Sequence, residues 1–175
     1  MSAEEELKEV SEHAKAPFEK TVAATMAVIA AALAIVSVLA QHAVTEQLLN
    51  QQKASDQWAY YQAKSIRRYQ SEVARDMLLA LKGDPAKEAA AKFSEAAKKY
   101  RDDGEKIQEA ARDLEKESKL EGSKSLRLHY AEIFLEIALV FGSLAILIKA
   151  QLLRWVSVAC LVLGIGIALT MLLIR

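Results

Sequence analysis

The sequence predicts an all-α membrane protein with three transmembrane helices and a long, coiled-coil-like antiparallel helical hairpin that projects from the membrane. Three observations lead to this fold class. The apolar residues are gathered in three blocks, each approaching the length needed to cross a bilayer. The charged residues lie mostly between the first and second blocks, in a stretch with helical periodicity. No segment shows the alternation of β-branched residues that is typical of strands.

The overall composition excludes some classes of function. The chain carries 23 basic and 23 acidic residues, so its formal net charge is zero, and a nucleic-acid-binding surface would need a basic excess. The one cysteine, Cys160, lies in an apolar block and leaves no intrachain disulfide to form. Ser/His/Asp arrangements with strand-turn signals, Gly-rich phosphate loops and Cys-x-x-Cys pairs are missing. We therefore expect no enzyme, no cofactor and no metal.

The first block, from Val22 to Ala40, has no charged residue and would cover about 28 Å as a helix, which is close to the thickness of a hydrocarbon core. We assign residues 21–41 to the first transmembrane helix. Residues 1–20 precede it as an acidic amphipathic tail, which we expect to form a short helix along the membrane surface. A stripe of small residues on the first span favours close packing against other helices.

The hairpin is predicted for residues 42–121. Neither Gly nor Pro occurs between Phe18 and Lys82, so nothing ends the first helix before the turn at 83–85. The returning segment shows a heptad with bulky residues in one row, at positions 86, 93, 100, 107 and 114, and small residues in the other, at positions 90, 97, 104, 111 and 118. The small row explains Gly104 in mid-helix, because it allows a close partner helix.

A tight turn places residues opposite each other when their numbers add to about 168. This register predicts charge pairs between Asp56 and Arg112, Lys53 and Glu115, Lys64 and Glu105, Asp76 and Lys92, and Arg67-Arg68 and Asp102-Asp103. The predicted inward row of the first arm is Leu49, Gln52, Asp56, Ala59, Ala63, Ile66, Gln70, Val73 and Met77. Trp58 and Tyr61 lie off that row. Either they widen the seam within the chain or they form a surface for self-association.

Two further spans follow the hairpin. We expect Gly122-Ser123 to interrupt the helix, and we assign residues 130–148 and 155–174 to the second and third transmembrane helices. The ionisable groups at the membrane margin are His42, His129, Glu132 and Glu136. Ionisable groups at this depth often serve proton or ion paths. A path of that kind, a metal site, and a simple His–Glu hydrogen bond between spans are the alternatives for this polar cluster.

The least generic stretch is Asn50 to Arg67, which reads NQQKASDQWAYYQAKSIR after the first apolar span. This motif resembles domain-of-unknown-function family 4337, a bacterial family of small membrane proteins, and the resemblance covers nearly the whole chain. It implies a bacterial inner membrane location and a shared fold, and it brings no catalytic residues. The candidate interaction surface on this stretch comprises Asn50, Gln51, Asp56, Trp58, Tyr61, Gln62, Lys64 and Arg67.

The expected function is that of a non-enzymatic membrane scaffold or interaction protein. It would be homo-oligomeric through the hairpin and the small-residue faces of the spans. The alternative is an oligomeric ion or small-solute channel with a polar path near Glu132 and Glu136. The expected partners are the lipid bilayer and further copies of the chain, with no nucleic acid and no identified protein partner. The distribution of Lys and Arg favours a cytoplasmic N-terminus and a periplasmic hairpin.

Overall fold

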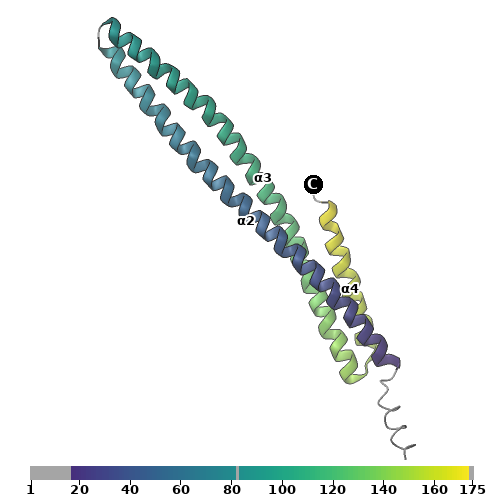
Figure 1. The fold of residues 1–175 in the computed structure, drawn as a ribbon. Helices are drawn as coiled ribbons and strands as arrows, with labels where there is room; N and C mark the ends of the chain where they lie inside the picture. The colour runs from purple at the N-terminus through teal and green to yellow at the C-terminus, as the bar shows by residue number, and fades with distance from the viewer. Residues whose placement is uncertain (1–16, 82, 174–175) are drawn as a thin grey trace, which may run out of the picture. The chain divides into compact units, whose positions relative to one another are not determined.

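The structure is a computed structural model that describes residues 17–81 and 83–173. Its elements are α2 (Pro17–Ala80), α3 (Asp84–Ile148), α4 (Gln151–Thr170) and the short 3₁₀ helix η1 (Met171–Leu173), as Figure 1 shows. The described residues contain no strand, so the prediction of an all-helical chain is confirmed for them. Of the tail predicted for residues 1–20, residues 1–16 lie outside the described residues, and residues 17–20 belong to α2.

Three helices are long and apolar enough to cross a membrane, judged by length and composition. Two of them are the apolar parts of α2 and α3, which extend to 64 and 65 residues, and the third is α4 together with η1. The chain is therefore compatible with a multi-pass membrane protein.

The connection between α2 and α3 uses the residues that the sequence singled out. Gly83 has a φ of 150°, which residues with a Cβ rarely adopt, and the amide of Lys87 donates to the Gly83 carbonyl oxygen at 3.3 Å. Pro85 is the second residue of α3, where the missing N–H costs nothing because it would have no partner inside the helix. At the other connection Lys149 has a φ of 53°, and it separates α3 from α4.

The predicted interruption at Gly122-Ser123 is wrong, because α3 continues through both residues to Ile148. One glycine inside a helix costs only about 1 kcal/mol relative to alanine. The residues on both sides are held by packing: Ser118 and Ser125 are buried, and Leu128 is 1% exposed. Such tertiary packing outweighs the local helix propensity at the two positions.

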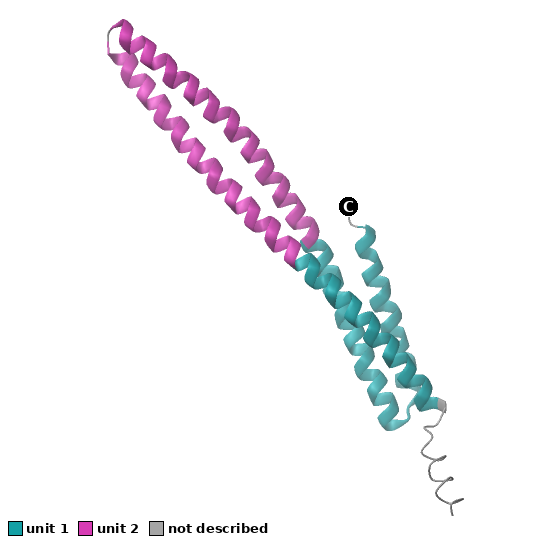
Figure 2. Cartoon of the chain, in the orientation of Figure 1, with its two compact units in different colours: residues 1–44, 122–175 teal, residues 45–121 magenta. Residues whose placement is uncertain are grey.

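The chain divides into two compact units (Figure 2). Unit 1 is formed by residues 1–44 and 122–175, and unit 2 by residues 45–121. Parts of α2 and α3 belong to each unit, whereas α4 and η1 belong to unit 1 alone.

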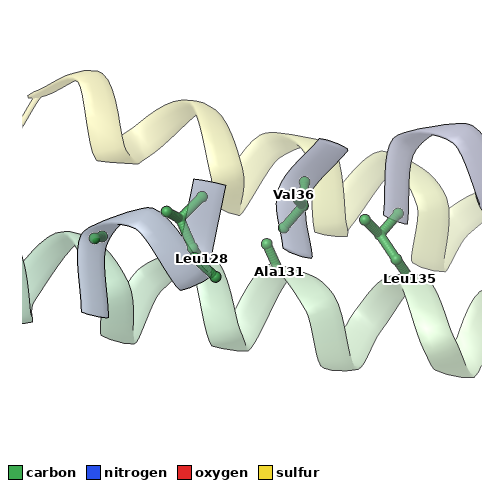
Figure 3. Packing of buried hydrophobic residues seen from close by; sticks show 6 residues of the cluster. Val36, Leu128, Ala131 and Leu135 are labelled. Atoms are coloured by element: carbon green, nitrogen blue, oxygen red, sulfur yellow. The ribbon is translucent and has the colours of Figure 1, made fainter. Parts of the chain in front are cut away.

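The core of unit 1 consists of apolar side chains between α2 and α3. Val36 of α2 lies above Ala131 of α3, with Leu128 and Leu135 on either side (Figure 3). Four buried residues of α2 in this unit recur every seven positions, as Val22, Ile29, Val36 and Ala43, and Ala40 is buried four residues after Val36. This spacing is typical of the seam between two helices that cross at a small angle.

Helix α4 packs on α3 through small residues. Ala131, Ala138 and Ala145 have no exposed surface, and the hydroxyl of buried Ser157 donates to the Ala138 carbonyl oxygen at 2.7 Å. A Cβ at Gly164 would lie 3.1 Å from the Ala131 carbonyl oxygen, so the two backbones approach closely here. Small residues allow such an approach, which increases van der Waals contact between helices.

Candidate functional site

The seam between the two arms of unit 2 is lined by small and polar residues. On the first arm Asn50, Ala54 and Ser71 are buried, and on the second arm the buried residues are Ala90, Ala97, Gly104, Ala111 and Ser118. The Ser118 hydroxyl donates to the Gln47 carbonyl oxygen at 3.0 Å, which fixes the two arms side by side. The heptad spacing predicted for the second arm is therefore present, with its small row in the seam.

The inward row predicted for the first arm is wrong. Leu49, Ile66, Val73 and Met77 are 46%, 57%, 53% and 67% exposed. Asn50 and Ser71 are buried instead, and they continue the seven-residue spacing that starts at Val22. The buried face of α2 thus follows the same spacing in its polar second half as in its apolar first half. The prediction chose the more apolar of two rows, and the seam uses the more polar one.

Trp58 takes part in the seam and is half-buried. Its indole N–H donates to Glu115 Oε1 at 2.8 Å across the two arms. The Tyr61 ring stands edge-on to the indole, with centroids 5.7 Å apart and an interplanar angle of 89°, which is a favourable aromatic arrangement. Of the two alternatives for these aromatics, these contacts favour a wider seam within the chain. Glu115, predicted as the partner of Lys53, instead accepts from Trp58.

Gly104 faces Tyr61, but it does not create a close backbone approach. A Cβ at this position would lie 3.5 Å from Tyr61 Cε2, which is an ordinary van der Waals contact. The seam therefore does not require glycine at position 104, because alanine would fit there as well.

We expect Gly104→Ala to stabilise unit 2 by up to about 1 kcal/mol, because alanine is the better helix former and the seam has room for its methyl group. Hydrogen exchange of amides in residues 45–121 of the full chain measures the effect. Gly104→Leu is the comparison, since its larger side chain would push Tyr61 aside. Faster exchange in Gly104→Ala than in the wild type would contradict the expectation.

Lys64 lies at the centre of a polar cluster in the same seam. Its Nζ donates to Asp103 Oδ2 at 2.9 Å and lies 5.3 Å and 5.5 Å from the ring centroids of Tyr60 and Tyr100. The hydrogen bond with Asp103 raises the pKa of Lys64, and the same bond lowers the pKa of Asp103. Both groups are therefore charged near neutral pH. The predicted partner of Lys64 was Glu105. The predicted register is therefore nearly right, but the observed partner lies two residues earlier on the second arm.

The other predicted charge pairs are replaced by different ones. Glu72 forms ion pairs with two arginines, with Arg68 Nε at 3.7 Å on the same helix and Arg101 Nη2 at 3.6 Å on the other arm. Asp76 pairs with its neighbour Arg75 at 2.8 Å, and Lys92 pairs with Glu88 at 3.2 Å on its own helix. Long side chains reach the nearest opposite charge, and these exposed pairs contribute only about 0–1 kcal/mol each.

The remaining residues of the candidate surface do not form one site. Asn50 is buried in the seam, and Gln51 is exposed, with its Oε1 3.4 Å from the Ser118 hydroxyl. Asp56, Gln62 and Arg67 are exposed, and Asp56 accepts a hydrogen bond from Gln52 at 3.1 Å. The structure thus splits the motif into seam residues and solvent-facing residues.

The exposed apolar surface of unit 2 lies elsewhere on α2. Here a shallow groove is lined by Ile66, Tyr69, Gln70, Val73, Ala74 and Met77, which we call the outer row. None of these residues is charged, and the spacing of Ile66, Gln70, Val73 and Met77 alternates between four and three, as in a coiled-coil seam. Four residues of the outer row, Ile66, Gln70, Val73 and Met77, were assigned to the interior by the sequence interpretation. Extending the seven-residue spacing of the buried positions from Val22 would have predicted that the outer row is exposed.

The polar cluster of unit 1 is assembled only in part. His129 Nδ1 lies 3.2 Å from Glu132 Oε2 on the same helix, whereas His42 and Glu136 are exposed. Within residues 17–81 and 83–173, no three His, Cys, Asp or Glu side chains come close enough together to hold a metal ion. The observed contact is thus a His–Glu hydrogen bond within α3.

These features define a class: an all-helical protein with three helices long enough to cross a membrane and a paired, highly charged helical segment. The chain belongs to the family described as Domain of unknown function (DUF4337), whose model matches residues 18–174. No curated protein and no solved structure matches the chain.

Proposed function

We propose that this protein is a non-enzymatic integral membrane scaffold that associates with copies of itself. Its insertion into a bilayer is supported by the outer surfaces of unit 1. Val38, Leu147, Leu152 and Leu172 are 69%, 76%, 75% and 71% exposed. Large apolar side chains exposed on every helix would be unfavourable in water, at about 25 cal/mol per Å², but not in lipid.

Residues 42–121 would form an antiparallel hairpin outside the bilayer, with the turn at 83–85. Contacts between the arms support this arrangement: rising numbers on α2 meet falling numbers on α3, from Gln47 with Ser118 through Lys64 with Asp103. The charged residues of this segment exclude it from lipid. The bacterial inner membrane, with the N-terminus in the cytoplasm and the hairpin in the periplasm, is the location that follows from the sequence.

The observation that carries the proposal of self-association is the outer row. Its large members Ile66, Tyr69, Val73 and Met77 are all more than half exposed, and no charged residue lines it, so two copies of the row can meet without opposing like charges. Membrane insertion would hold two copies parallel and at the same height, so each residue of the row would meet its own counterpart. Restricting the copies to a membrane also lowers the entropy lost on association.

Val73→Glu tests this proposal, because it places a carboxylate in the middle of the outer row of both copies. We expect the full chain in lipid nanodiscs to be oligomeric, and the variant to associate at least about tenfold more weakly, which corresponds to about 1.4 kcal/mol. Mass photometry over a range of protein-to-nanodisc ratios measures the effect.

Ala110→Glu is the matched control, since Ala110 is an exposed apolar residue on the other arm and the same charge is added there. It should associate as the wild type does. A wild-type chain that stays monomeric at every ratio, or a Val73→Glu variant that associates like Ala110→Glu, would refute the outer row as the interface.

An oligomeric channel is the second candidate, and the exposure of Glu136 favours it. This carboxylate is exposed on α3, just before the uncharged run that ends at Ile148, whereas Glu132 is engaged by His129. A carboxylate at that depth would be more stable facing a water-filled path between subunits than facing lipid. A ring of subunits with Glu136 around a continuous polar lumen would support the channel, and a dry bundle would support the scaffold.

A further inference from the structure

Unit 1 contains an apolar groove that the proposed scaffold role does not use. Its walls come from Ile35 and Leu39 of α2, Leu128 of α3, and Ile165, Leu169 and Leu172 of α4 and η1, and its volume is about 280 Å³. Its lining is almost entirely apolar, so ordered water would find no hydrogen-bond partners there. The α2 wall belongs to the uncharged block from Val22 to Ala40, so in an inserted protein this groove faces hydrocarbon.

A basic side chain is adjacent in the sequence to residues that line this groove. Arg127 precedes Leu128, which lines the groove, and Arg127 Nη1 donates to the carbonyl oxygen of Thr170 at 3.2 Å. Thr170 in turn lies between two lining residues, Leu169 and Met171. The guanidinium is thus tied to the C-terminal end of α4, within one residue of the groove on both helices.

The chemistry of Arg127 suits an anion at this position. A guanidinium has five N–H donors in a planar fork, and one bond to a carbonyl leaves donors for a bidentate contact with a phosphate. The Arg127 side chain is exposed, so a ligand can reach it. Lys124 lies three residues before it on the same helix face and adds a second positive charge to the field there.

We propose that unit 1 binds one anionic phospholipid, with an acyl chain in the apolar groove and the phosphate at Arg127. This inference rests on the membrane insertion proposed above, but not on self-association. Two features carry it: an apolar groove of about 280 Å³, and a tethered cation whose sequence neighbours on α3 and α4 line that groove. Basic sites next to apolar surfaces between membrane helices are a general means of holding lipid head groups.

The test compares two lipids and two kinds of variant. The full chain is reconstituted in mixed micelles with equal amounts of phosphatidylglycerol and phosphatidylcholine, and native mass spectrometry counts the lipid retained on each chain. We expect the wild type to retain phosphatidylglycerol at least about tenfold better than phosphatidylcholine. Arg127→Gln should abolish this preference by lowering phosphatidylglycerol retention much more than phosphatidylcholine retention. Both lipids carry a phosphate, but the choline charge of phosphatidylcholine already offsets its attraction to the arginine, and glutamine removes the charge while keeping the groove.

Ala168→Leu fills the groove without altering Arg127, and it should reduce the retention of both lipids. Arg154→Gln is the control, since Arg154 lies over the Trp155 ring at 5.8 Å near the other end of α4, and it should behave as the wild type. Circular dichroism checks that each variant is helical. If Ala168→Leu has lost helix, Ala32→Leu replaces it, because it fills the same groove from α2.

Equal retention of the two lipids by the wild type, or full retention in the groove-filled variant, would overturn the proposal. A lipid that is released when chains associate would assign the groove to a second copy instead, and would overturn it too. The Val73→Glu variant separates this inference from the scaffold: it should retain phosphatidylglycerol normally while associating weakly. Extraction of the wild-type chain from vesicles by alkaline carbonate would refute the insertion on which both proposals rest.

Discussion

Gly164→Leu is expected to be the most destabilising single substitution in unit 1. A Cβ at Gly164 would lie 3.0 Å from Leu135 Cγ and 3.1 Å from the Ala131 carbonyl oxygen. The carbonyl belongs to the α3 backbone and cannot turn aside as a side chain can, so α4 would have to move away from α3. Overpacking of this kind typically costs about 1–3 kcal/mol, and we expect the upper part of that range because a leucine adds three further carbons.

Gly166→Leu is the matched control for this prediction. It lies two residues further along the same helix, and nothing lies within 4 Å of a Cβ built there. Both variants gain helix propensity equally. Reversible unfolding in mixed micelles, followed by circular dichroism, should show the loss for Gly164→Leu and no loss for Gly166→Leu. Equal stability of the two variants would mean that α3 and α4 are not in close contact at Ala131.

Trp58→Ala should cause the largest loss in unit 2. Replacement of a core Trp by alanine costs about 3–5 kcal/mol, and Trp58 is half-buried, so we expect about 2–3 kcal/mol. The loss has two parts: the packing of the indole against Tyr61, and the hydrogen bond to Glu115. Trp58→Phe keeps much of the ring and removes only the bond, which should cost about 1–2 kcal/mol since the acceptor is charged.

Hydrogen exchange of amides in residues 45–121 reports these losses without unfolding unit 1. Phe93→Ala is the comparison in the same unit, because Phe93 is an aromatic residue on the other arm that is 40% exposed. It should accelerate exchange less than Trp58→Ala does. If Trp58→Phe exchanges as slowly as the wild type, the contact between the indole and Glu115 contributes nothing to the pairing of the arms.

The sequence was sufficient for the elements that depend on local chemistry. The absence of Gly and Pro between Phe18 and Lys82 predicted one long helix, and the glycine and proline at the turn have the roles expected of them. The interruption at Gly122 was predicted from the same local rules and is wrong, because packing on both sides of the glycine outweighs its low propensity.

The candidate site was harder to predict, since it depends on which face of α2 is inside. Two rows of that helix have heptad spacing, the seam row and the outer row. The outer row is the more apolar of the two, so sequence reasoning favours it as the core. The seam instead contains Asn50, Lys64 and Ser71. Lys64 is bonded to Asp103 across the arms, and the Ser71 hydroxyl donates to the Arg67 carbonyl oxygen of its own helix. The individual charge partners, such as Asp103 rather than Glu105, depend on rotamers that no register can specify.

The seven-residue spacing that relates the buried residues Val22, Ile29, Val36, Ala43, Asn50 and Ser71 along α2 has a consequence for how the length of this protein can change. Inserting or deleting one residue between positions 50 and 66 would turn everything beyond it by about 100°. Asn50 and Ser71 could not then both remain buried, and the outer row would rotate toward the second arm. Length changes in steps of seven, made in both arms together, preserve every face. The spacing therefore allows the paired helices of unit 2 to lengthen in whole heptads and disfavours any other change of length.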